Sequence, residues 1–333
     1  MDQIAVIGAG SWGTAAAWLA SANVEVRLWA RRDDLVTQIN TDRQNASYLP
    51  GRTLPSSLSA TSDLPQAVAG AGLVVFAVPS HGFREVFAAI QPHLPVGAPL
   101  VSLTKGIEQG TLLRMTEVMA EVAPDADPKR LGVLTGPNLA SEIAAEQPTA
   151  AVVAMGDQQA AEAIQRVFMG SLFRVYTNDD VPGCEMGGSL KNVMAIAAGM
   201  SDGMGFGDNT RDSLITRALA EMTRLGTRLG GRPATFAGLA GMGDLIATCV
   251  SDKSRNHRVG FNLARGKTLD EITEEMNMVA EGVKTTQAVL DLAGRFSVDM
   301  PIATHVGRVL YDGMDPSEAM LSLMTREAKP EVR

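Results

Sequence analysis

The sequence predicts an α/β domain with a mostly parallel sheet, followed by an all-α helical domain. In the first half, short apolar runs alternate with amphipathic runs of helical period, which is typical of βαβ units whose sheet is covered on both faces. Beyond about Asp180 the strand pattern stops and only helical periodicity remains. A chain of 333 residues is also long enough to bury two cores.

The expected strands are the short runs rich in Val, Ile, Leu and aromatic residues. They cover Gln3–Ile7, Glu25–Trp29, Leu73–Val78, Leu100–Leu103, Leu131–Leu134, Thr149–Ala154 and Phe173–Tyr176. Apolar residues at helical spacing lie between them and predict helices over Thr14–Ala20, Gly82–Ile90, Leu112–Val122 and Gln158–Phe168.

The second half is expected to be helical, with Arg211–Leu229 as its clearest amphipathic helix. Glycine-rich joints at residues 203–207 and 238–243 separate the helices. The class of structure changes near Val181-Pro-Gly183, so the predicted domains are residues 1–182 and 183–333. A cleft between two such domains is the usual place for a ligand.

Composition excludes several classes of partner. A net charge of −8 argues against nucleic acid or an anionic membrane surface as the main partner. The chain begins directly with a strand, without the basic and apolar regions of a signal peptide. No apolar stretch is expected to reach membrane-spanning length, since the longest, around Val193–Met200, is broken by glycine and Asp202. His and Cys residues lack metal-ligand spacing, so we expect no metal site. Without a signal peptide or a membrane-spanning stretch, we expect a cytoplasmic enzyme.

The segment Gly8-Ala-Gly-Ser-Trp-Gly13 lies between the first strand and the first helix. In a Rossmann-type fold the first glycine makes the turn, and Gly10 lets the backbone approach a pyrophosphate. Gly13 then allows helix and strand to pack closely. The phosphates of a dinucleotide would lie at the helix N-terminus, where free N–H groups favour anions.

The end of the second strand indicates which dinucleotide binds. NAD sites usually carry an acidic residue there for the ribose hydroxyls. This chain has Arg31 and Arg32 instead, which suit the 2′-phosphate of NADPH. The alternative is that both arginines are merely solvated and that Asp33 caps the next helix, so NADH remains possible.

Two lysines are the candidates for acid–base chemistry. Lys191 is the only charged residue in the apolar run Met186–Met200, and a buried lysine can have its pKa lowered toward neutrality. Lys105 directly follows a strand, at the sheet edge where ligands bind. The alternatives are a Lys191 that extends to water and a Lys105 in an exposed turn.

Three further segments carry groups suited to an anionic substrate. Thr135–Ala140 follows a strand, Gly241–Asp244 places a carboxylate in an apolar joint, and Ser254-Arg-Asn256 offers a hydroxyl, a guanidinium and an amide. Each is also compatible with a turn or a cap, and Ser254 could simply cap a helix through Val259. The residues alone predict a dehydrogenase with a small, anionic substrate.

With these motifs the chain resembles the bacterial-type NAD(P)-dependent sn-glycerol-3-phosphate dehydrogenases over nearly its whole length. The matching segments are Gly8–Gly13, Leu103–Ile107, Gly136–Asn138, Gly188–Val193, Asp202–Asn209, Gly238–Thr248, Ser254–Asn256 and Val279–Gly282. Asn138 departs from many relatives, which have Ser or Thr there.

The resemblance implies reduction of dihydroxyacetone phosphate to sn-glycerol 3-phosphate for phospholipid synthesis, with Lys191 as proton acceptor in the oxidation direction, and a homodimeric assembly. The cofactor contacts it implies are Ser11, Trp12, Arg31, Arg32, Lys105, Ala140, Arg255, Val279 and Glu281. The substrate contacts it implies are Lys105, Gly136, Asn138, Asp244, Ser254, Arg255 and Asn256.

Three alternatives remain at this stage. A ketopantoate-type or other hydroxyacid reductase shares this organisation but does not need the Ser254–Asn256 phosphate site. A non-catalytic NADPH-binding regulator would not require two lysines in a closed apolar site. A methyltransferase also uses a glycine-rich first loop, but it usually has an acidic residue in place of the arginine pair.

Overall fold

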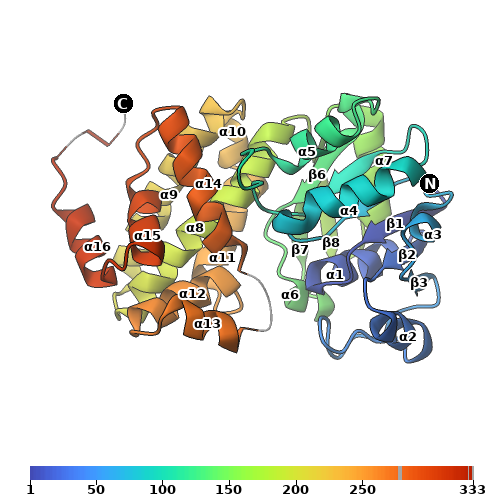
Figure 1. Cartoon of the computed structure of the whole chain (residues 1–333), viewed down its shortest axis with the longest axis horizontal. Helices are drawn as coiled ribbons and strands as arrows, with labels where there is room; N and C mark the ends of the chain where they lie inside the picture. The colour runs from blue at the N-terminus through green and yellow to red at the C-terminus, as the bar shows by residue number, and fades with distance from the viewer. Residues whose placement is uncertain (277–279, 329, 332–333) are drawn as a thin grey trace.

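The computed structural model describes residues 1–276, 280–328 and 330–331, and it has a sheet-containing half and a helical half (Figure 1). The sheet has eight strands in the order β3-β2-β1-β4-β5-β6-β7-β8. They are β1 Gln3–Ile7, β2 Glu25–Trp29, β3 Leu58–Thr61, β4 Val74–Phe76, β5 Leu100–Ser102, β6 Leu131–Thr135, β7 Thr149–Met155 and β8 Phe173–Asn178. All neighbours are parallel except β6 and β7. The predicted Rossmann-type, mostly parallel fold is confirmed.

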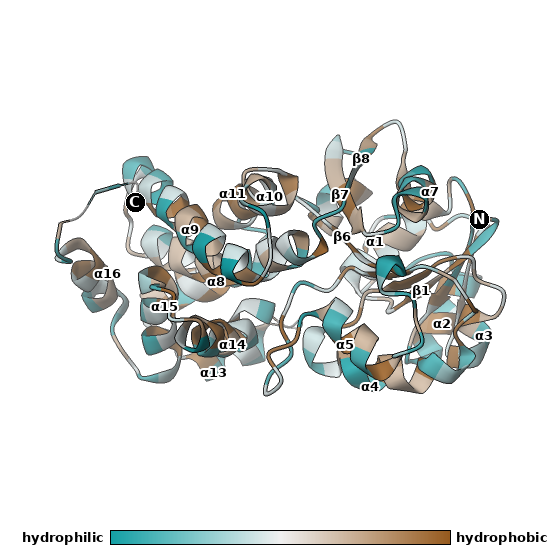
Figure 2. Ribbon diagram, turned by 90° about the horizontal axis from the view of Figure 1, so that it is seen from above, coloured by the Kyte–Doolittle hydropathy of each residue, from teal (hydrophilic) through white to brown (hydrophobic). Residues whose placement is uncertain are grey.

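The sheet is covered on both faces, as the apolar strands predicted. Along β1, Ile4 and Val6 belong to the core on one face, whereas Ala5 and Ile7 belong to the core on the other. The central strands are mostly brown in Figure 2, because neither face meets water. The helices of this half are α1 Ser11–Ala20, α2 Asp33–Thr41, α3 Leu64–Val68, α4 Phe83–Ile90, α5 Met115–Val122, α6 Ala140–Ala144 and α7 Gln158–Phe168.

Two predictions about this half were wrong in detail. Strand β3 was missed because Leu58-Ser-Ala-Thr61 is short and has a single large apolar residue, although it pairs with β2. The helix expected from Leu112 begins instead at Met115, because Leu112 has a φ of 63° that no helix accommodates. Arg114 caps that helix together with Glu117.

The helical half contains α8 Val181–Gly203, α9 Asp208–Arg228, α10 Pro233–Phe236, a π-helical turn Leu239–Gly243, α11 Asp244–Val250, α12 Arg255–Ala264, α13 Leu269–Glu275, α14 Glu281–Arg295, α15 Pro301–Tyr311 and α16 Pro316–Met324. The predicted change to all-α structure after Asp180 is confirmed. The predicted boundary between residues 182 and 183 falls in the first turn of α8.

Helix α8 belongs to both halves. Near its start, Cys184 packs with Val133 and Val152 of the sheet. Further along, residues such as Val193 and Ile196 lie at the centre of the helical core. Figure 1 shows α8 running from the sheet into the middle of the outer helices. The position of any side chain on this helix is therefore fixed relative to the sheet as well as to the helical half.

One helical run is longer and more apolar than the sequence analysis expected. Pro233–Val250 is long and apolar enough to cross a membrane by length and composition alone, and 44 % of it is buried within the chain. It is composed of α10, the π-helical turn and α11, and it packs beside α8. The expectation that no stretch reaches that length was therefore wrong, but core helices often pass the same test.

Candidate active site

The glycine turn has the shape that a dinucleotide site needs. Gly8 has a φ of +118°, and a Cβ there would lie 2.7 Å from the Ala77 carbonyl oxygen. A Cβ on Gly13 would overlap the Gly8 carbonyl oxygen, so only glycine lets α1 pack this closely. A Cβ on Gly10 would meet open space. Gly10 is also the N-cap of α1 and has no side chain to obstruct a phosphate at the helix N-terminus.

The arginines after β2 are exposed, as a contact with a 2′-phosphate requires. Arg32 is the N-cap of α2, and its Nε lies 3.6 Å from Asp34 Oδ1. Both side chains of that pair are largely in water, so the pair is weak and Arg32 is available to a stronger anion. Asp33 is the first residue of α2 and not its cap, which corrects the alternative raised from sequence.

The two predicted lysines meet at one buried carboxylate. Lys191 Nζ donates to Asp244 Oδ1, and Lys105 Nζ donates to Asp244 Oδ2 over 2.6 Å. Lys105 Nζ also donates to the Gly136 carbonyl oxygen over 2.9 Å. The Asp244 side chain is only 2 % exposed. Strand β5, the turn after β6, helix α8 and helix α11 therefore converge at one point.

Burial sets the protonation of this cluster. Lys191 is 6 % exposed as a residue, so the alternative in which its amine reaches water is wrong. Loss of hydration lowers the pKa of Lys191 to about 8, the Asp244 carboxylate opposes that shift, and the Lys105 charge adds to it. A lysine with such a pKa can both give and take a proton near neutral pH.

Two polar residues of the cluster were not singled out from the sequence. Thr248 Oγ1 accepts from Lys191 Nζ over 2.6 Å, and Asn192 Nδ2 donates to the Lys105 carbonyl oxygen over 3.1 Å. Thr248 lies four residues after Asp244 on α11, so it shares a face of the helix with that carboxylate. Its four-residue spacing from Asp244 is the feature by which Thr248 could have been predicted from the sequence.

The segment after β6 forms one wall of the cluster. Gly136 has a φ of +133°, and Asn138 Nδ2 donates to the Ala150 carbonyl oxygen over 3.1 Å. Asn138 Oδ1 and Thr135 Oγ1 are buried without a hydrogen-bond partner among the described residues. Buried polar atoms of this kind usually have a partner, so these two are free to bond a ligand.

The Ser254–Asn256 segment is connected to the cluster through Asn192. Asn256 Nδ2 donates to Asn192 Oδ1 over 2.9 Å, and Asn256 Oδ1 accepts from Gly282 N over 2.9 Å. Ser254 Oγ accepts from His257 N and caps α12, so the capping alternative is confirmed, although the helix continues to Ala264. That bond leaves the Ser254 hydroxyl proton free to donate.

The other predicted cofactor residues that the structure describes lie around the same edge. Ser11 and Trp12 begin α1, and Ala140 begins α6. Glu281 begins α14 and accepts from Ser80 N over 3.2 Å and from Ser80 Oγ over 2.5 Å, which ties the two halves together. Val279 lies outside the described residues.

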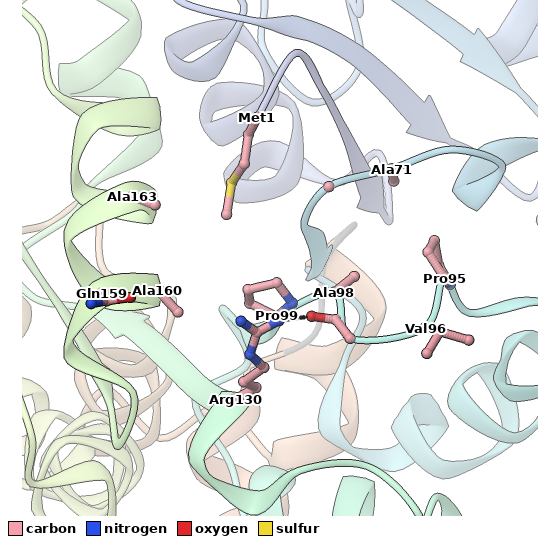
Figure 3. A pocket seen from close by; sticks show the side chains of 12 residues that line it. Met1, Ala71, Pro95, Val96, Ala98, Pro99, Arg130, Gln159, Ala160 and Ala163 are labelled. Carbon is pink, nitrogen blue, oxygen red and sulfur yellow. Dashed lines mark hydrogen bonds between the residues drawn. The ribbon is translucent and has the colours of Figure 1, made fainter.

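A recess of about 350 Å³ lies at the opposite, amino edge of the sheet (Figure 3). Its walls include Met1, Pro99 and Ala160. Its one guanidinium, Arg130, donates to the Gly97 carbonyl oxygen and lies 3.3 Å from Asp157 Oδ2. Because that charge is paired and the lysines are at the other edge, this recess is not the active site.

Comparison with known proteins agrees with this geometry. Residues 3–161 match the family described as NAD-dependent glycerol-3-phosphate dehydrogenase N-terminus, and residues 180–321 match the corresponding C-terminus family. A glycerol-3-phosphate dehydrogenase [NAD(P)+] from Streptomyces griseus is 52 % identical over 333 residues, 99 % of this chain and 98 % of that protein. One from Geobacter sp. strain M21 is 50 % identical over 331 residues, 99 % of each chain.

Solved structures give the same result. The crystal structure of a glycerol-3-phosphate dehydrogenase from Coxiella burnetii is 38 % identical, has a TM-score of 0.93 and covers 98 % of this chain and 99 % of its own. A ketopantoate reductase from Ralstonia eutropha has a TM-score of 0.52 at 17 % identity over 96 % of this chain and 99 % of its own, which shows a shared fold alone. The chain therefore belongs to the NAD-dependent glycerol-3-phosphate dehydrogenase family of oxidoreductases.

Proposed function

We propose that this enzyme reduces dihydroxyacetone phosphate to sn-glycerol 3-phosphate with NADPH, and that Lys191 donates the proton in that direction and accepts it in reverse. The observation that carries the proposal is the buried cluster of Lys191, Asp244 and Lys105. Two ammonium groups share one carboxylate, so the cluster has a net positive charge when both lysines are protonated. Such a charge favours both a phosphate ester and the oxyanion that develops at the substrate carbonyl.

The residues divide the work of the reaction. NADPH, when bound, supplies the hydride to the substrate carbonyl carbon. Lys191 Nζ gives its proton to the carbonyl oxygen, which becomes the secondary hydroxyl of the product. Asp244 and Thr248 hold that amine in place, since both bond it directly. Lys105, fixed by Asp244 and the Gly136 carbonyl, stabilises negative charge on the substrate.

The substrate phosphate would be held by the Ser254–Asn256 segment together with the Gly136–Asn138 turn. Arg255 would contact both substrate and cofactor. Desolvation lowers the pKa of its guanidinium, and the nearby Glu281 carboxylate opposes that shift. The unpartnered Asn138 Oδ1 is an acceptor and suits a substrate hydroxyl, because it cannot donate to a phosphate oxygen.

The first test is turnover of the purified enzyme with dihydroxyacetone phosphate, with NADPH and NADH oxidation followed separately. Unphosphorylated dihydroxyacetone and ketopantoate are the control substrates. We expect turnover that requires the phosphate, and inhibition by inorganic phosphate. Tight NADPH binding without turnover would favour the regulator, and turnover of ketopantoate would favour the other reductase.

The arginine pair carries the proposed NADPH preference. Replacing Arg31 and Arg32 together with alanine is expected to weaken NADPH binding by roughly tenfold to a hundredfold, because charge-assisted bonds to the 2′-phosphate are lost. NADH binding should change by less than about twofold, since NADH has no 2′-phosphate. Titration of both cofactors measures this, with Arg166→Ala on α7 as an exposed control. Equal loss for both cofactors would refute the 2′-phosphate assignment.

The pKa of Lys191 predicts opposite pH profiles for the two directions. Reduction needs the protonated amine, so kcat/KM for reduction should fall as pH rises through about 8. Oxidation needs the neutral amine, so its kcat/KM should rise through the same pH and then level off. Measurements between pH 7 and 10 avoid titration of the substrate phosphate, whose second pKa is about 6. If kcat/KM changed with pH in the same direction for reduction and for oxidation, Lys191 would not be the acid and base.

The cellular setting of the enzyme is also a proposal. We expect it to act in the cytoplasm and, as the resemblance implies, to supply glycerol phosphate for phospholipid synthesis. We also expect a homodimer, for which Met242, Ile246 and Val250 give support because they form an exposed apolar row on one face around α11. Light scattering of the wild type and of Ile246→Glu would test that assembly.

A further inference from the structure

We infer that Asn45 is a positioning residue that holds the glycine turn in its cofactor-binding shape. The inference rests on the proposed cofactor site at Gly8–Gly13. Asn45 is 0 % exposed and lies between α2 and β3, far in sequence from the turn. Its Nδ2 donates to the Ala9 carbonyl oxygen over 3.0 Å and to Thr14 Oγ1 over 2.8 Å.

These two bonds join both ends of the turn. Ala9 lies between Gly8, which makes the turn, and Gly10, which would approach the pyrophosphate, and Thr14 lies in the first turn of α1. A loop of this composition has many accessible conformations, because glycine restricts the backbone least. One amide that bonds both places favours the observed conformation of the turn, in which the space beside Gly10 is open. The cofactor then does not have to order the loop when it binds.

Asn45 is itself held firmly. Its main-chain oxygen accepts from Tyr48 N over 3.2 Å and from Leu49 N over 2.8 Å. Two residues earlier, Arg43 donates through Nε to the Leu54 carbonyl oxygen over 3.0 Å and through Nη2 to that of Leu58 over 2.6 Å. These bonds close the segment before β3 into a compact loop. The main chain of Asn45 is therefore held in place, and its side chain can position the glycine turn.

The Oδ1 atom of Asn45 indicates that an amide is present here because of the two hydrogen bonds that its Nδ2 donates. Asn45 Oδ1 is buried and has no hydrogen-bond partner among the residues described. An unpartnered buried carbonyl is unfavourable, and an apolar side chain of similar size would avoid it. The amide is therefore explained by its bonds to Ala9 and Thr14 and not by packing alone.

The chain offers a control in Asn23, which is exposed but makes the same number of amide bonds. Like Asn45 Nδ2, Asn23 Nδ2 donates to two acceptors, here the main-chain carbonyl oxygens of Val167 and Met169, each over 3.0 Å. Asn23 precedes β2, at the amino edge of the sheet and away from the glycine turn. Asn23→Ala therefore loses the same number of amide bonds as Asn45→Ala without touching the cofactor site.

The experiment measures dissociation constants for NADPH and NADH, together with kcat and both KM values, for Asn45→Ala, Thr14→Val, Asn23→Ala and Gly10→Val. For Asn45→Ala we expect both cofactors to bind roughly tenfold more weakly, by the same factor, because the turn contacts the pyrophosphate that they share. The kcat at saturating cofactor and the KM for dihydroxyacetone phosphate should stay within about twofold of wild type. Thr14→Val, which removes one of the two bonds, should give a smaller effect of the same kind.

The outcomes separate the inference from the proposal beneath it. If Gly10→Val abolishes cofactor binding while Asn45→Ala and Thr14→Val bind as wild type, the positioning role is overturned and the cofactor site stands. If Asn23→Ala weakens cofactor binding as much as Asn45→Ala, the effect is one of general stability and the inference is also overturned. If Gly10→Val binds both cofactors normally, the proposed cofactor site itself is wrong.

Discussion

Replacing Lys191 with alanine is expected to lower turnover by a factor of roughly a hundred or more, while NADPH binds almost as well as to the wild type. Loss of a general acid typically costs that much or more. Asp244 keeps Lys105 as its partner in the variant, so no buried charge is left unpaired and the fold should persist. The loss should appear in kcat and in kcat/KM together, because the interaction acts in the transition state.

The controls for Lys191→Ala are Lys253→Ala, which removes an exposed lysine paired with Glu142, and Lys191→Arg. The first should turn over at the wild-type rate. The second keeps a positive charge but cannot give up a proton near neutral pH, so it should be nearly as slow as the alanine variant. Wild-type turnover by Lys191→Ala would remove Lys191 as the acid and base.

Replacing Gly260 with alanine is expected to lower the free energy of unfolding by about 3 kcal/mol or more, an unusually large effect for one methyl group. A Cβ on Gly260 would overlap the Ile196 carbonyl oxygen and lie 2.8 Å from Met200 N. On the other side of the same contact, a Cβ on Gly199 would overlap the His257 carbonyl oxygen. Helices α8 and α12 therefore touch backbone to backbone, and neither can move without displacing the other.

Chemical denaturation of Gly260→Ala and Gly294→Ala measures this effect. Gly294 lies in α14, and a Cβ there would meet open space, so its replacement should be neutral or stabilising by up to about 1 kcal/mol. Loss of activity should accompany Gly260→Ala, since α8 carries Lys191 and α12 carries Asn256. Equal stability of the two variants would show that the helices can separate at little cost.

The sequence predicted the site best where a motif or residue has no ordinary structural explanation. Ordinary packing does not explain three features of the site. They are the glycine turn between a strand and a helix, the lone lysine in an apolar run, and the lysine directly after a strand. The structure brings Lys191, Lys105 and Asp244 together. The strands of the sheet were also predictable, because strands that are buried on both faces are continuous apolar runs in the sequence.

Other features depend on contacts between distant segments. Asn45 and Thr248 are ordinary polar residues in sequence, and only the fold places them beside Ala9 and Lys191. Strand β3 is stabilised by its pairing with β2 more than by its own composition. The antiparallel direction of β7 also leaves no local signal, because β-propensity does not encode the direction of the neighbouring strand.

The shared helix α8 has a consequence for how this chain can be divided. A fragment ending at residue 182 would lose Cys184 and expose Val133 and Val152, so it would tend to aggregate instead of folding as an autonomous nucleotide-binding module. The complementary fragment would keep Lys191 but lose the sheet that orients its helix. We therefore expect exchange of one half between relatives to give a folded protein only where the incoming sheet and α8 already match, so that the two halves are inherited together.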